Sequence, residues 1–172
     1  MSRNHSKSLF NLESNKYSIV IEDPFLVTDI ELDNTFHQSA ELSKTAMRAI
    51  ANLIADISNY CKSESEIVLI GLGKGGPFLP GVASGLRANG FSIVGYLFVN
   101  SPIPGAIEPK ASDFIFFESL PLLSDWPDAP VFYLWDLEIH TKNAQEATLR
   151  GWQVINEVTP HSVIEAANSL FF

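Results

Sequence analysis

The feature that most constrains the fold is the stretch of residues 66–80, EIVLIGLGKGGPFLP, in which an apolar run ends in glycines. Residues 67–70 are all Ile, Val or Leu, and such an unbroken run is typical of a strand that is buried on both faces of a sheet. The glycines that follow permit a tight turn, and Pro77 suits the first position of a helix. The stretch therefore predicts a strand, a turn and a helix, with the functional site near residue 73.

The rest of the chain continues this alternation of strands and helices. Strands are expected at 17–21, 93–99, 131–135 and 153–158, and amphipathic helices at 38–60, 77–89, 141–150 and from 159 onward. Met47 and Ile164 belong to the apolar helix stripes and are expected in the core. The pattern predicts an α/β fold, with a mainly parallel sheet of about five strands and helices on both faces.

Two further segments do not fit the alternating pattern. Residues 1–16 are rich in Ser, Asn and Lys, which predicts a flexible arm before a single domain at 17–172. A helix capped at Ser112 is expected to carry Phe114, Phe116 and Phe117, either in the core or as the wall of a cleft.

Composition excludes several classes of function. The net charge of -9 disfavours nucleic acid as a partner, because phosphates would be repelled. The only cysteine, Cys61, allows no internal disulfide, and no histidine spacing suggests a metal site, so neither metal nor cofactor is expected. No apolar run is long enough to cross a membrane, and no export signal is recognised, which predicts a cytoplasmic protein.

Candidate site residues follow from the predicted topology. Ligands of parallel sheets bind beyond the carboxyl ends of the strands. We call this carboxyl edge of the sheet the rim. The residues expected there are Asp23, Pro24, Gly73, Lys74, Asn100, Ser101, Asp136, Glu138 and His140.

The glycine turn admits two interpretations. Gly71, Gly73 and Gly76 match the G-x-G-x-x-G fingerprint of dinucleotide sites. That fingerprint requires an acid at the end of the next strand, where this chain has Asn100, and the prolines of the following helical turn remove amide donors. The alternative is a nucleophile elbow, G-x-S-x-G, with the frame of residues 71–75, GLGKG.

The elbow frame and four other segments carry a family resemblance. Residues 67–80, 95–105, 125–130, 133–134 and 150–154 resemble the elbow and later strands of small bacterial α/β-hydrolase fold proteins. The resemblance covers about residues 17–172. It implies a three-layer α/β-hydrolase-like sandwich in which the N-terminal strands and the lid are reduced.

Two departures from the family bear on activity. Gly73 stands where the nucleophilic serine is expected, and Val158 runs directly into Thr159 where a loop with the catalytic histidine is expected. Ordinary serine hydrolysis is therefore excluded. The resemblance implies a triad-less protein that binds a small or peptidic ligand in the former active-site cleft. Its expected role is that of an accessory protein or a non-hydrolytic enzyme, of epimerase or cyclisation type, in a biosynthetic pathway.

Other functions remain open at this point. Asp136 stands where the family has its acid, and Asp136 or His140 could activate water in a non-serine hydrolase. A structural pseudoenzyme that binds a partner through an exposed sheet edge, or a homodimer that covers this edge, is a further alternative. Gly73 could also simply relieve strain in an abandoned elbow. The expected ligand-binding residues are Asp23, Pro24, Gly73, Lys74, Gly75 and Asn100, and the catalytic candidates are Asp136, His140 and His161.

Overall fold

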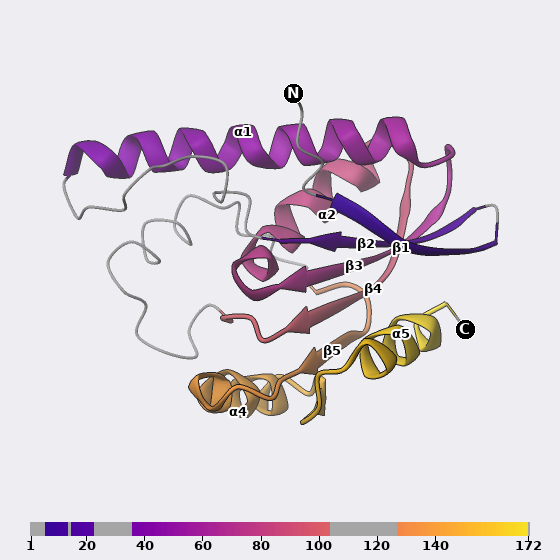
Figure 1. Cartoon of the computed structure of the whole chain (residues 1–172). Coiled ribbons are helices and arrows are strands. Elements are labelled where there is room, and N and C mark those ends of the chain that lie inside the picture. Colours follow the sequence, from indigo (N-terminus) through magenta and orange to yellow (C-terminus); the bar gives the residue numbers. More distant parts are fainter. Residues whose placement is uncertain (1–5, 14, 23–35, 104–126, 172) are drawn as a thin grey trace.

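The computed structural model describes residues 6–13, 15–22, 36–103 and 127–171 (Figure 1), with the backbone alone for 6–13 and 36–46. The expected helix at Ser112 with its three phenylalanines, and the site candidates Asp23 and Pro24, lie outside the described residues.

The core of the fold is one six-stranded sheet whose strand order follows the chain. Neighbouring strands from β2 to β6 are parallel, while β1 is antiparallel to β2. Figure 1 shows the arrowheads of the strands from β2 to β5 pointing the same way. The predicted parallel sheet of about five strands is thereby confirmed. The strands are β1 (Ser6–Glu13), β2 (Lys16–Ile21), β3 (Glu66–Leu72), β4 (Ser92–Val99), β5 (Val131–Leu134) and β6 (Gln153–Ile155).

Helices connect β2 to β3, β3 to β4 and β5 to β6, as the apolar spacing predicted, and a further helix follows β6. The helix α5 (Pro160–Ser169) begins with a capping box, in which the side chains of Thr159 and Ser162 each accept the other's backbone N–H. The turn after α4 uses Gly151 at a φ of +78°. The helices are α1 (Phe36–Tyr60), η1 (Gly73–Phe78), α2 (Leu79–Ala88), η2 (Glu138–His140), α4 (Thr141–Leu149) and α5 (Pro160–Ser169), where η marks a 3₁₀ helix.

Alternate residues of the strands face two separate apolar clusters. Ile67 and Leu69 of β3 pack in a cluster that includes side chains of α1, α2 and α4. Val68 and Ile70, from the same strand, pack in a second cluster with Ala166 and other residues of α5. Because successive strand residues point to opposite faces, helices cover both faces of the sheet. This confirms the general α/β architecture.

The first strand corrects the expectation of a loose N-terminal arm. Ser6–Glu13 pairs with β2 in a hairpin, with Glu13 opposite Lys16 and Ser6 opposite Ile21. Its polar composition gives a weak strand signal by itself. The hydrogen bonds that the edge of β2 offers decide its conformation, and propensity alone does not report such pairing.

Two residues of the helix stripes are not in the core as expected. Met47 is 49% exposed, whereas Ile50, one turn later, is buried. Figure 1 shows the amino-terminal part of α1 extending past the end of the sheet. Ile164 is 39% exposed because its neighbour Val163 takes the inward position on α5. None of the helices in the described ranges is both long and apolar enough to span a bilayer.

Candidate functional site

The candidate site is built around a sharp turn between β3 and α2. Leu72 is still extended, with φ -93° and ψ 125°, and the next residue, Gly73, has a φ of +52°. The chain then enters η1 and continues into α2 without a break. A positive φ turns the backbone sharply within one residue. Residues other than glycine and asparagine rarely adopt this conformation.

Three glycines around this turn are required by close packing. A Cβ atom on Gly71 would lie 2.5 Å from the Cα atom of Gly76. A Cβ on Gly75 would overlap the carbonyl oxygen of Ile21 at the end of β2, and one on Gly76 would overlap the hydroxyl of Ser101. The turn is thus pressed against the carboxyl ends of both neighbouring strands, and larger residues would force these strands apart.

Gly73 has different surroundings from these three glycines. Among the residues that the structure describes, a Cβ atom built there would have one neighbour within 4 Å, the backbone oxygen of Asn100 at 4.0 Å. Gly73 itself is only partly buried. The described residues therefore leave room for a side chain at the position where the resemblance places a serine, and among them only the backbone conformation favours glycine.

Asn100 and Asp136 join the ends of the two strands that follow the turn. The side-chain amide of Asn100 donates to the Asp136 carboxylate at 2.8 Å. In return, the Asn100 side-chain oxygen accepts the backbone N–H groups of Asp136 at 3.0 Å and Leu137 at 3.3 Å. Asn100 holds a φ of +45°, an unusual conformation that these bonds maintain. The rim between β4 and β5 is therefore a fixed structure.

The buried hydroxyl of Tyr133 adds a further hydrogen bond to the same rim. Tyr133 of β5 donates its hydroxyl to the backbone oxygen of Ser101 at 2.6 Å. Burial raises the pKa of Tyr133 well above its ordinary value, so this hydroxyl stays protonated. The segment after β4 is consequently anchored to β5 at two successive residues.

His140 lies on the segment that leaves this rim. It ends η2, and its Nδ1 lies 3.1 Å from the side-chain nitrogen of Asn143 in α4. The side-chain oxygen of Asn143 accepts the backbone N–H of Ile103 at 2.8 Å. Desolvation by burial lowers the pKa of His140, which favours the neutral ring.

Two apolar side chains on this segment face solvent. Leu137 is 52% exposed and Ile139 is 74% exposed. They alternate with the charged residues Asp136 and Glu138, which are also exposed. The rim therefore combines carboxylate, amide and apolar groups within a few residues.

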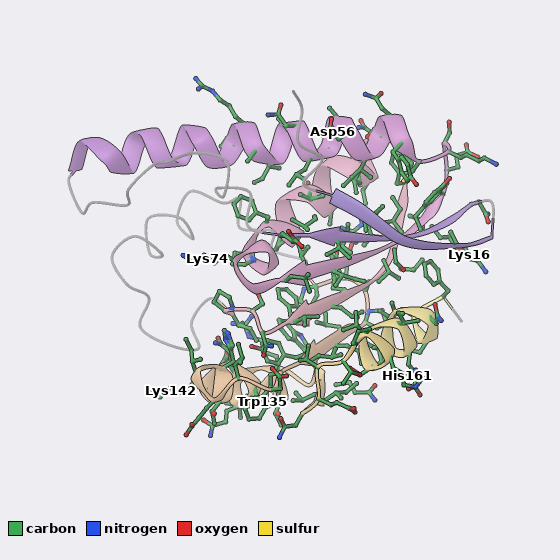
Figure 2. All side chains as sticks on the ribbon, in the orientation of Figure 1. Lys16, Asp56, Lys74, Trp135, Lys142 and His161 are labelled. Atoms are coloured by element: carbon green, nitrogen blue, oxygen red, sulfur yellow. The ribbon has the colours of Figure 1, made fainter. Side chains whose placement is uncertain are left out.

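The structure brings most of the predicted site residues to one edge. Asn100 and Asp136 are joined by hydrogen bonds, and the backbone oxygen of Asn100 lies 4.0 Å from where a Cβ of Gly73 would be. Gly75 is packed in the same turn, and Lys74 is exposed beside it. His161 is separate from this group. Its side chain is 88% exposed on α5 and pairs with Glu165 at 3.4 Å, and Figure 2 shows it well away from Lys74.

Sequence reasoning missed two residues that support the rim, Tyr133 and Asn143. The sequence indicates Tyr133 only as part of a strand and of a segment that carries the family resemblance, and Asn143 only as part of a helix. The available signal was an asparagine followed directly by the small residue Ala144 in the first turn of a helix, and Asn143 is in fact fully buried. A polar side chain in such a place must find hydrogen-bond partners.

Comparison with protein-family models, with curated proteins and with solved structures finds no match for this chain. The function is therefore inferred from the geometry of the rim. Within the described residues, no three His, Cys, Asp or Glu side chains come together in a way that could hold a metal ion.

Proposed function

We propose that this chain is an α/β-hydrolase-like protein without a nucleophile, which binds a small or peptidic ligand over the turn at Gly73. The observation that carries the proposal is the contrast among the glycines of the turn. A Cβ on Gly71 or Gly75 would collide with neighbouring backbone, whereas at Gly73, at the carboxyl edge of a parallel sheet, no described residue comes closer to such a Cβ than 4.0 Å. This edge is where such folds bind their ligands.

The chemistry of the rim favours a ligand with both a carbonyl or carboxylate group and an apolar part. The first amides of η1, from Lys74 and Gly75, have no carbonyl partner within the helix, and amides at such a position suit an oxygen that carries negative charge. Leu137 and Ile139 offer exposed apolar surface on the neighbouring segment. An acylated amino acid or a short peptide combines both features.

The role that follows is that of an accessory protein or of a non-hydrolytic enzyme, such as an epimerase. In epimerisation, a proton leaves a carbon next to a carbonyl group and returns on the other face, so no serine is needed. The protein would orient the substrate and stabilise the enolate oxygen by hydrogen bonds. Hydrolysis through a covalent intermediate has no candidate nucleophile at this turn.

Ligand-dependent thermal stabilisation tests the proposal. A panel of N-acyl amino acids and short peptides is screened for a saturable rise in melting temperature, which measures binding to the folded state. Gly73→Asn fills the space over the turn with a residue that tolerates positive φ, and we expect it to abolish the rise. Gly90→Asn is the matched control, because Gly90 has a φ of +91° and a Cβ there would meet nothing within 4 Å.

Two results would count against the proposal. One is an absence of stabilisation by any member of the panel, and the other is equal loss of binding in Gly73→Asn and Gly90→Asn. A further variant, Gly73→Ser, restores a hydroxyl at the elbow. Without a histidine loop, we expect it to show no burst of product with a chromogenic ester.

A further inference from the structure

The side chain of Asn143 lies between the ring of His140 and the backbone of Ile103. Asn143 is fully buried in α4, and both ends of its amide are used. Its oxygen lies 2.8 Å from the backbone nitrogen of Ile103, and its nitrogen lies 3.1 Å from Nδ1 of His140.

These contacts leave one arrangement of hydrogen atoms. A backbone N–H can only donate, so the atom of Asn143 that faces Ile103 must be the oxygen. The other end is therefore the NH₂ group, which can only donate. Nδ1 of His140 must then be an acceptor, and it carries no proton.

We propose that Asn143 is a positioning residue that holds His140 as the neutral Nε2–H tautomer, so that His140 acts at the rim as a hydrogen-bond donor. In this tautomer the lone pair of Nδ1 is occupied by Asn143, and Nε2 already bears the proton. The ring has no free basic nitrogen with which to activate water. This state matches the desolvated surroundings of His140, which disfavour the charged ring.

The consequence for the ligand rests on the proposed function. Within the described part of the chain, Nε2 of His140 has no hydrogen-bond partner. An Nε2–H group on the segment that follows Asp136 would donate to a carbonyl or carboxylate oxygen of a ligand. The site would then recognise an acceptor at two places, the turn at Gly73 and His140.

The tautomer is measured directly by NMR of ¹⁵N-labelled full-length protein. Two-bond correlations in the histidine rings distinguish a nitrogen that bears a proton from one that does not. We expect Nδ1 of His140 to be unprotonated and Nε2 to be protonated, with the signals assigned by their loss in His140→Gln. A protonated Nδ1 in the wild-type protein at neutral pH would overturn the proposal.

Asn143→Asp is the decisive variant, since it keeps the shape of the side chain and still accepts the N–H of Ile103. Its second carboxylate oxygen cannot donate, so Nδ1 must supply the proton, and we expect Nδ1 of His140 to become protonated, in the neutral Nδ1–H tautomer or in the imidazolium that pairs with the carboxylate. His161 is the internal control, because its ring is exposed and its spectrum should be unchanged. If the variant folds and Nδ1 stays unprotonated, the proposal is wrong; if the variant does not fold, the wild-type spectrum decides.

Ligand binding and the tautomer can fail independently. A panel without any binder, together with the expected wild-type tautomer, removes the proposed function but leaves the role of Asn143. When a binder is found, we expect its addition to shift the Nε2–H signal of His140, and binding with no change at that signal would contradict its role as a donor.

Discussion

The amide of Asn100 donates to the carboxylate of Asp136 at 2.8 Å and thereby ties the carboxyl end of β4 to that of β5. The same asparagine also accepts two backbone N–H groups beyond β5, while its own backbone stays at a φ of +45°. One side chain thus fixes the shape of the rim on which the candidate site is built.

Substituting Asn100 and Asp136 separately should show which of the two side chains contributes more to the free energy of unfolding. Asn100→Ala loses three hydrogen bonds and keeps an unfavourable backbone, so we expect it to lower the free energy of unfolding by about 2 kcal/mol. Asp136→Ala loses one bond at an exposed carboxylate and should cost about 0.5 kcal/mol. Asn100→Gly relieves the backbone and should fall between the two in urea unfolding. Equal losses for all three variants would show that Asn100 does not organise the rim.

The glycines of the turn should differ sharply in their tolerance of a methyl group. Gly75→Ala places a Cβ on the carbonyl oxygen of Ile21, and we expect a loss of about 3 kcal/mol in the free energy of unfolding. Gly73→Ala enters open space and suffers only from its positive φ, at a cost of about 1 kcal/mol. Chemical denaturation of both variants measures the difference. A Gly73 variant as unstable as the Gly75 variant would mean that the space over the turn is filled.

The stability of the fold should depend on pH through His140. Burial lowers its pKa below the ordinary value of 6.5. As the pH falls through 6.5, the unfolded chain takes up a proton at this ring before the folded chain does, so the free energy of unfolding decreases. The decrease ends once the pH is below the pKa of the folded state. At higher pH, both states hold the neutral ring and this contribution is constant.

The free energy of unfolding, measured at several pH values between pH 5 and pH 8, should therefore change less with pH for His140→Gln than for the wild-type protein. His161→Gln is the matched control, because that ring is exposed on α5. A pH dependence unchanged by His140→Gln would show that the ring titrates alike in both states.

Cys61 should be unreactive in the folded protein. The thiol is buried, and desolvation raises its pKa to about 11. Since the thiolate is the reactive form, a chromogenic disulfide reagent at pH 8 should label it slowly in buffer and rapidly in denaturant. Fast labelling without denaturant would indicate local opening at the end of α1.

The sequence predicted those features that depend on local patterns. The apolar run at 67–70 identified a doubly buried strand, Thr159 and Pro160 marked the start of α5, and Asn100 and Asp136 were assigned to the same rim. Each of these follows from residue type and spacing alone.

The remaining features depend on contacts between distant parts of the chain. Ser6–Glu13 becomes a strand because β2 offers it an edge, and the difference between Gly73 and Gly75 appears only once Ile21 is placed beside the turn. Asn143 acquires its importance from Ile103, which is 40 residues earlier. No pattern along the chain reports such pairs.

The agreement between strand order and chain order has a consequence for biosynthesis. Each strand from β2 onward pairs with the strand made just before it, so a chain leaving the ribosome can extend the sheet without rearranging it. The helix α5, which packs on the face formed by Val68, Ile70 and Leu97, is made only after all six strands. Until α5 has been made, this apolar face lacks that cover, so the nascent chain is more prone to aggregation and more in need of a chaperone before that point than after it.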